Sequence, residues 1–132
     1  MTDNTSKLPN KNTLRDKLGL DKNCNIILGV GNFSYRKNWL AAIRSVEKVN
    51  NSLLVLVGSG KEKKNYNLYI KEHCIEDRIL IIDRKEGNEL KEYFKVSDLF
   101  ILPSISDHFG FVVVEALASD LPVLCSKYAG VS

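Results

Sequence analysis

Two carboxylates flank a glycine between residues 107 and 115. Asp107 stands shortly before Gly110, and Glu115 follows Asp107 by eight residues. A glycine lets the backbone approach a ligand closely, and the amides around it would open a helix, whose free N–H groups suit a phosphate. At about 1.5 Å rise per residue, the two acids would lie roughly 12 Å apart, far enough to straddle an extended ligand. The same spacing also fits an ordinary loop and a half-buried helix that packs Val112, Val114 and Leu117.

A pair of cations, Arg36 and Lys37, follows the first apolar run of the chain. Basic residues are disfavoured at a helix start, so this pair is either a solvated one or one placed to meet a ligand. Cations that converge with a helix start suit a diphosphate, and carboxylates suit the hydroxyls of a sugar. These residue types therefore indicate a ligand that carries both groups.

The elements that must position these residues alternate along the chain. Continuous apolar runs predict strands over residues 25–30, 53–57, 79–82, 99–102 and 123–125. Helical patterns lie at residues 12–19, 63–74 and 89–95, and another begins at Asn38, which we expect to act as its N-cap. Buried strands that alternate with helices predict an α/β fold, a doubly wound, Rossmann-like parallel sheet whose ligand crevice lies at the carboxyl ends of the strands.

Composition narrows the class of protein. The chain has 132 residues, of which 44% are hydrophobic and 27% charged, which is typical of one globular domain. Residues 1–11 are polar and read as a tail or linker, and residues 12–132 form the domain. A net charge of +3 does not indicate a nucleic-acid partner. Three widely spaced cysteines form neither a disulfide framework nor a zinc pattern, and the sequence has no transmembrane run or signal peptide, so we expect a cytoplasmic location.

Three common nucleotide-binding patterns fail on particular residues. Residues 29–34 approximate the dinucleotide G-x-G-x-x-G pattern, but Ser34 stands in place of the third glycine. Residues 58–61 approximate a P-loop, but Val55 and Glu62 stand where a glycine and a Ser or Thr are required. A phosphoacceptor receiver domain needs an acidic pair after the first strand, and that loop reads Gly-Asn-Phe.

Four motifs in order instead match a known family. They are Ile-Leu-Gly-Val-Gly at residues 27–31 with Lys37, Leu-Val-Leu-Val-Gly-Ser-Gly at 54–60, Asp-Leu-Phe-Ile-Leu-Pro-Ser at 98–104, and the acid-flanked segment at 107–123. From about residue 12 to the last, the chain resembles the C-terminal, nucleotide-sugar-binding half of GT-B fold glycosyltransferases of the group 1 (family 4) type. Such a resemblance implies an enzyme of polysaccharide biosynthesis.

The resemblance also implies a role for each site residue. Lys37 would bind the donor diphosphate and offset charge on the leaving group, Asp107 would contact the donor sugar, and Glu115 would hold the nucleotide ribose. These three would form the catalytic set, amides at 109–111 would hold phosphate oxygens, and residues 82–84 would read the base. The full set of implied donor contacts is Gly31, Asn32, Arg36, Lys37, Asp83, Arg84, Asp107, His108, Phe109, Gly110, Phe111 and Glu115.

The implied activity is hexosyl transfer from a nucleoside diphosphate sugar, such as a UDP- or GDP-sugar, with retention of configuration and without a metal or other cofactor. The other half of such an enzyme is an acceptor-binding domain, which we expect on a missing domain or a separate subunit. We also expect the domain to be incomplete at its C-terminus and the isolated chain to be inactive. Peripheral association with a membrane surface is compatible with the family and stays open.

Departures from the family pattern support an alternative. Asn32 replaces the usual loop arginine, Asp107 is one methylene shorter than the usual glutamate, and His108 replaces a glycine. The alternative is a degenerate, non-catalytic Rossmann-like module that serves as a surface for a protein partner. Binding of nucleotide sugars separates the two hypotheses.

Overall fold

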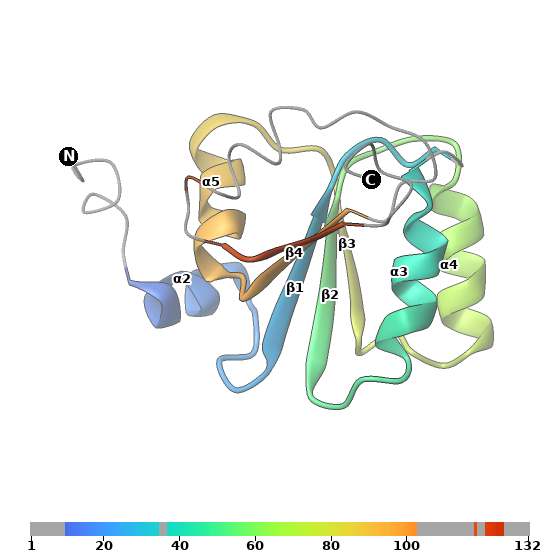
Figure 1. The fold of residues 1–132 in the computed structure, drawn as a ribbon, viewed down its shortest axis with the longest axis horizontal. Coiled ribbons are helices and arrows are strands. Elements are labelled where there is room, and N and C mark those ends of the chain that lie inside the picture. Colours follow the sequence, from blue (N-terminus) through green and yellow to red (C-terminus); the bar gives the residue numbers. More distant parts are fainter. Residues whose placement is uncertain (1–9, 35–36, 103–117, 119–120, 126–132) are drawn as a thin grey trace.

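In the computed structural model, which describes residues 10–34, 37–102, 118 and 121–125, five parallel strands form one sheet (Figure 1). The strand order is β3-β2-β1-β4-β5. The strands are β1 (Asn25–Val30), β2 (Ser52–Val57), β3 (Ile79–Ile82), β4 (Leu99–Leu102) and β5 (Val123–Cys125). The order reverses direction between β1 and β4, which is the topological switch of a doubly wound fold. The predicted parallel, Rossmann-like α/β architecture is confirmed.

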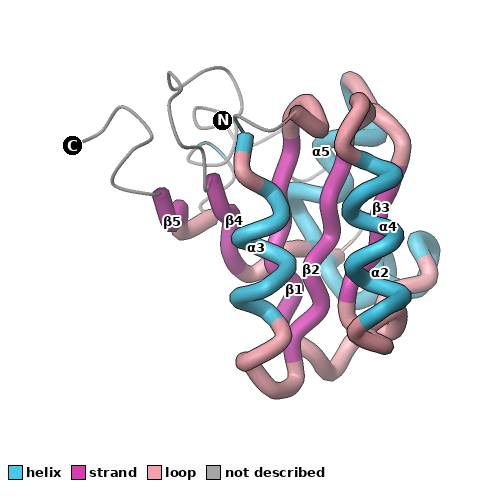
Figure 2. Tube along the Cα trace, turned by 90° about the vertical axis from the view of Figure 1, so that its right-hand side faces the viewer, coloured by secondary structure: helices cyan, strands magenta, loops and turns pink. Residues whose placement is uncertain are grey.

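Among the described residues, four helices cover the two faces of this sheet. They are α2 (Lys11–Leu18), α3 (Trp39–Val46), α4 (Lys63–Glu72) and α5 (Gly87–Val96). Figure 1 shows α2 and α5 on one side and α3 and α4 on the other, and Figure 2 looks onto α3 and α4 with the strands behind them. Because both faces are covered, strand β2 is apolar from Leu53 to Val57, and its residues 54–56 are fully buried.

The start of α2 differs slightly from the sequence-based expectation. Asn10 is its N-cap, and the side-chain Oδ1 of this residue accepts a hydrogen bond of 2.9 Å from the amide of Thr13. The helix ends at Gly19, as predicted, in the left-handed conformation with φ of 75°. The folded part of the chain therefore reaches back at least to Asn10, inside the stretch that composition assigns to the tail.

The capping role expected of Asn38 is wrong in its mechanism. Asn38 precedes α3 but has a left-handed backbone, with φ of 58°, and its side chain makes no capping hydrogen bond. A capping side chain requires an extended backbone at the cap, from which its oxygen can reach the first free amides. Just before Asn38, the Lys37 amide donates a hydrogen bond of 3.1 Å to the Ser34 carbonyl.

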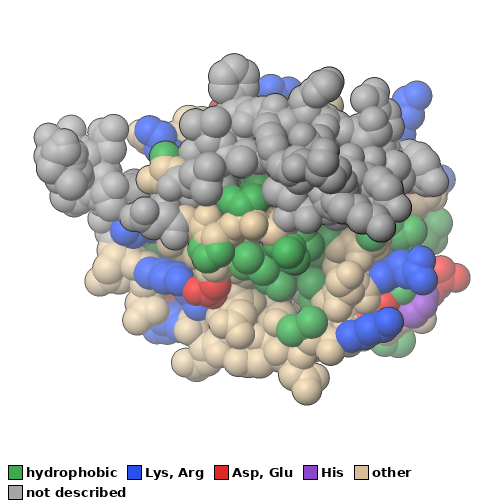
Figure 3. All heavy atoms as spheres, viewed as in Figure 1, with side chains coloured by type: hydrophobic (Ala, Val, Ile, Leu, Met, Phe, Trp, Pro, Cys, Tyr) green, Lys and Arg blue, Asp and Glu red, His purple; other side chains and the backbone are tan. Residues whose placement is uncertain are grey.

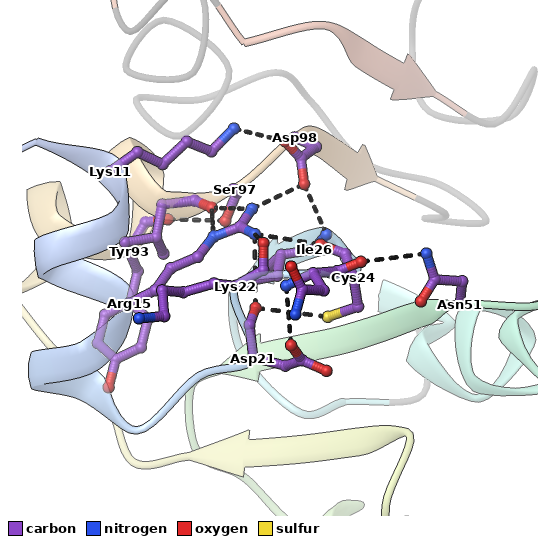
Figure 4. A network of polar contacts seen from close by, with 12 residues as sticks. Lys11, Arg15, Asp21, Lys22, Cys24, Ile26, Asn51, Tyr93, Ser97 and Asp98 are labelled. Carbon is purple, nitrogen blue, oxygen red and sulfur yellow. Dashed lines mark hydrogen bonds and ion pairs between the residues drawn. The ribbon is translucent and has the colours of Figure 1, made fainter.

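A buried arginine that sequence reasoning did not single out fastens α2 to the sheet (Figure 4). The side chain of Arg15 is only 5% exposed, and its guanidinium donates to the Asp98 carboxylate at 2.8 Å. It also donates twice to the Val96 carbonyl, at 2.8 and 3.1 Å. Further donations reach carbonyls of the loop before β1, at Asp21, Lys22 and Cys24. One side chain thus joins α2, the entry to β1, and the end of α5.

Asp98 balances that buried charge from the start of β4. Its carboxylate also accepts hydrogen bonds from Lys11 and from the amide of Ile26, at 2.8 Å for the latter. Burial works to raise the pKa of Asp98, but the bonds from Lys11, Ile26 and Arg15 together outweigh burial and hold that pKa below its ordinary value. The folded state therefore favours the ionised carboxylate.

The edge strand β5 has an exposed apolar side chain. Within the described part of the chain it pairs only with β4, and Leu124 on it is 54% exposed. Figure 3 shows hydrophobic side chains gathered on the face where β5 lies in Figure 1.

Burial raises the pKa of the Cys24 thiol, at the entry to β1, so this cysteine is disfavoured as a thiolate nucleophile.

We expect Asp98→Asn to destabilise the fold at neutral pH because it leaves Arg15 without its counter-charge. Fully buried pairs lose about 3 to 5 kcal/mol when one partner is removed. Asp98 keeps 32% side-chain exposure, so we expect about 2 kcal/mol. A lowered folded pKa stabilises the protein above the ordinary value of 3.8, and this stability is lost as the pH falls through the folded pKa. Urea unfolding at neutral and acid pH should therefore show a difference between the two proteins that shrinks in acid.

Candidate functional site

A hollow of about 620 Å³ lies at the carboxyl ends of β1, β2 and β3, beside the start of α5. This is the edge of a doubly wound sheet at which ligands bind. We call it the strand-end hollow. Its described lining is Val30, Gly31, Asn32, Lys37, Val57, Gly58, Ser59, Arg84, Lys85, Glu86, Gly87 and Leu90.

The floor of the strand-end hollow is built by a backbone contact between two loops. An added Cβ at Gly58 would lie 1.9 Å from the carbonyl oxygen of Gly31 and 3.1 Å from the ring of Phe33. Hydrogen bonds extend the β1–β2 pairing past the strand ends, from the Gly31 amide to Val57 at 3.1 Å and from the Phe33 amide to Ser59 at 2.8 Å. The two loops can run this close only because position 58 has no side chain.

Phe33 anchors the β1 loop to α4. Its side chain is 1% exposed, and its ring meets that of Tyr66 edge to face at a centroid distance of 5.5 Å. Its carbonyl accepts a hydrogen bond of 2.9 Å from the amide of Glu62. An added Cβ at Gly60 would come within 2.6 Å of that carbonyl oxygen, so the second loop glycine also serves close backbone packing.

Trp39 supports the β1 loop from the first residue of α3. Its side chain is fully buried, and its indole Nε1 donates a hydrogen bond of 2.9 Å to the carbonyl of Asn32. The ring fills the space left open at Gly29, where an added Cβ would lie 2.6 Å from Trp39 Cζ3. The indole therefore ties helix α3 to the loop that carries Lys37.

Cationic side chains dominate the charged lining of the strand-end hollow. Lys37 comes from the β1 loop, and Arg84 and Lys85 come from the segment between β3 and α5. Glu86 is the acidic residue of the described lining, and its Oε2 lies 3.8 Å from Nε of Arg84. Cations gathered at a strand-end crevice can bind an anion such as a diphosphate. Within the described part of the chain, no group of acidic, histidine and cysteine side chains could hold a metal.

The structure brings some of the predicted site residues together and leaves one apart. Gly31, Asn32, Lys37 and Arg84 all line the strand-end hollow. Asp83 does not line it, because its carboxylate pairs with Lys63 of α4 at 3.2 Å and is 80% exposed. The predicted residues that lie outside the described part of the chain are Arg36, Asp107, His108, Phe109, Gly110, Phe111 and Glu115.

Sequence reasoning missed several lining residues, among them Ser59, Lys85 and Glu86. The segment 58–60 is part of a family motif and fails as a P-loop, and neither interpretation predicts that its glycines serve contact between loops. The available signal was positional: each of these residues follows a strand of the predicted parallel sheet, and the carboxyl ends of parallel strands meet at one edge.

Comparison with known proteins decides the family. A family model described as glycosyl transferases group 1 matches residues 10–132. The chain belongs to the group 1 glycosyltransferases. An uncharacterized glycosyltransferase of Haemophilus influenzae is 35% identical over 131 residues, covering 93% of this chain and 36% of the relative. The group 1 chain spans about a third of the length of the curated relatives it matches.

Solved structures agree with this assignment. WaaG, a glycosyltransferase involved in lipopolysaccharide biosynthesis, superposes with a TM-score of 0.80 at 26% identity, over 93% of this chain and 34% of its own. HepE of Anabaena, in complex with UDP and glucose, has the same fold with a TM-score of 0.79 at 23% identity, over 90% and 33%. The family predicted from the motifs is confirmed, and the chain aligns to the C-terminal type of domain in the GT-B fold.

No helix in the described ranges combines the length and the apolar content that crossing a bilayer would require.

The contact at Gly58 predicts a large effect from a single methyl group. Gly58→Ala would force the two loops apart, because the atom in the way belongs to the backbone and cannot rotate aside. We expect a loss of about 2 kcal/mol in unfolding free energy, within the range for overpacked sites. Displacement of the β1 loop should also shift the emission of Trp39, the only tryptophan in the chain.

Gly19→Ala is the matched control. Gly19 has φ of 75° and open space around it, so its substitution strains the backbone without creating a clash. We expect it to lower stability by about 1 kcal/mol and to leave the emission of Trp39 unchanged. Unaltered stability and emission in Gly58→Ala would contradict the tight loop contact.

Proposed function

We propose that this chain is the donor-binding part of a group 1 hexosyltransferase and that its strand-end hollow binds a nucleoside diphosphate sugar. The observation that carries the proposal is the convergence of Lys37, Arg84 and Lys85 at the carboxyl edge of a Rossmann-like sheet in a member of this family. The complex of the relative HepE with UDP and glucose supports the same class of ligand.

The proposed chemistry relies on charge stabilisation at the leaving group. When the glycosidic bond to the donor phosphate breaks, negative charge builds on the departing nucleoside diphosphate. A lysine held at the strand ends would offset that charge as it develops, which is the kind of interaction that lowers a reaction barrier. Lys37 is half-buried and lines the strand-end hollow, so its ammonium would act from beside the bound diphosphate.

The segment between β4 and β5 would complete the proposed site. Asp107 would contact the donor sugar, Glu115 would hold the ribose, and the amides at residues 109–111 would bind phosphate oxygens. Arg36 would add a second cation from the β1 loop. All these residues lie outside the described part of the chain, so their roles rest on the family resemblance of their motif.

Other properties of the whole enzyme are also part of the proposal. We propose that transfer retains the anomeric configuration and needs no metal, because cationic side chains would neutralise the diphosphate. The group 1 chain spans about a third of its curated relatives, so an acceptor-binding domain would have to come from elsewhere in a longer protein or from a partner subunit. We therefore propose that these 132 residues bind donor but do not transfer sugar alone.

Titration calorimetry with UDP-, GDP- and ADP-sugars tests the proposal. We expect one class to bind, and Lys37→Ala or Glu115→Ala to weaken its binding about tenfold or more, as for loss of a charged hydrogen bond. Lys48→Ala removes the same charge from an exposed site beyond α3 and should leave the affinity unchanged. A folded wild-type chain that binds none of these compounds would refute the proposal and favour the non-catalytic module.

Asp83 and Arg84 are neighbours that the family resemblance assigns to the same donor site, but Asp83 pairs with Lys63. Arg84 lines the strand-end hollow, so Arg84→Ala should weaken donor binding about fivefold to tenfold. Asp83 is turned to α4, and Asp83→Asn should change the affinity less than about twofold. The reverse order of effects in the same calorimetric assay would show that Asp83 contacts the donor directly.

A further inference from the structure

We infer that Trp39 is a positioning residue for Lys37, and that Gly31 forms with it a seat for the lysine side chain. This inference deepens the proposed function and rests on it, since it concerns how the donor-binding lysine is held. It is drawn from the packing around the β1 loop and concerns residues to which neither the family motif nor the proposed function gives this role.

The first observation is the shared space above Gly31. An added Cβ at Gly31 would lie 3.3 Å from Cζ2 of Trp39, and 3.8 and 3.9 Å from Cε and Cδ of Lys37. The indole edge and the lysine stem therefore flank one and the same point on the backbone. A methyl group at position 31 would therefore touch the lysine stem at ordinary contact distance and press on the indole.

The second observation is the polar tie beneath the loop. The indole Nε1 of Trp39 donates to the Asn32 carbonyl at 2.9 Å, next to Gly31 in the chain. Asn32 as a residue is exposed, and the bond at its carbonyl is partly buried. This hydrogen bond from a fully buried side chain thus fixes the position of the loop. The indole ring itself is held by packing into the space at Gly29.

The third observation is the close packing of the indole against the sheet. Trp39 is fully buried, and its Cζ3 would lie 2.6 Å from an added Cβ at Gly29 of β1. The ring is therefore packed against the sheet while its N–H holds the loop. A buried side chain with a single packed position transmits the sheet geometry to the loop more precisely than the loop backbone alone could.

The consequence concerns the lysine. Lysine has a flexible four-carbon stem and loses side-chain entropy when it is ordered on a ligand. A seat that restricts the stem before the donor arrives lowers that cost at the moment of binding. Trp39 would therefore contribute to donor affinity through Lys37, without contact with the donor.

A double-mutant cycle tests whether Trp39 acts on donor affinity through Lys37. Trp39→Phe keeps an aromatic ring in the packed position and removes the N–H. We expect it to weaken binding of the preferred nucleotide sugar about threefold to tenfold by calorimetry, as for loss of one hydrogen bond. In the Lys37→Ala background the same substitution should change affinity less than about twofold, because interacting residues are not additive.

Controls separate positioning from general packing. Tyr93→Phe alters another buried aromatic side chain, on α5, and should leave donor affinity unchanged in both backgrounds. Thermal unfolding of every variant checks the fold. Should Trp39→Phe fail to fold, Gly31→Ala carries the test. With φ of 156° at Gly31 this substitution strains the backbone as well as pressing on the indole, so its effect on affinity should be smaller in the Lys37→Ala background, and equal effects in both backgrounds would contradict the seat.

The outcomes distinguish this inference from the proposed function. A wild-type chain that binds no nucleotide sugar overturns both. A wild-type chain that binds, with losses from Trp39→Phe that are equal in the presence and absence of the Lys37 side chain, overturns only the role of Trp39 as a positioning residue. Weakened binding that disappears in the Lys37→Ala background supports it.

Discussion

The contact between the backbones of Gly31 and Gly58 constrains the whole functional edge of this protein. Two parallel strands leave the sheet side by side, and their loops stay hydrogen-bonded beyond the strand ends, as the bonds from Gly31 to Val57 and from Phe33 to Ser59 show. Only an absent side chain at position 58 permits this approach. The loop that carries the candidate donor-binding lysine therefore rests on a rigid floor, which is the arrangement that a binding site requires.

At the opposite side, where β1 and β4 begin, an ion pair holds the sheet to α2. Arg15 is buried and satisfied by one carboxylate and several backbone carbonyls, and Asp98 is satisfied in turn by Lys11 and the Ile26 amide. A buried ion pair gives little net stability by itself, but breaking it is costly, so it favours one arrangement of helix and strands over its alternatives. Glycine contacts at one edge and an ion pair at the other thus fix β1, the central strand of the sheet.

Pattern reasoning recovered the strands and helices because each depends on local periodicity, and the family because its motifs lie in short segments. It failed where a residue acts across the chain. Asp83 follows the right strand but turns to Lys63 on α4, and Asn38 precedes a helix but enters it with a backbone that excludes side-chain capping. Ser59 and Lys85 line the hollow because of which strands are neighbours, which periodicity does not report.

By itself the sequence determined the α/β class, the order of elements, the family, and the expectation that ligand-binding loops follow the strands. Apolar runs and helical spacing are local properties, and they survive without knowledge of the fold. The tertiary structure alone decided that the loop glycines serve backbone contact and that Arg15 and Asp98, 83 residues apart, form one pair. It also decided that the buried indole of Trp39 holds the carbonyl of Asn32 in the β1 loop. These depend on distances between segments remote in sequence, which only the folded chain brings together.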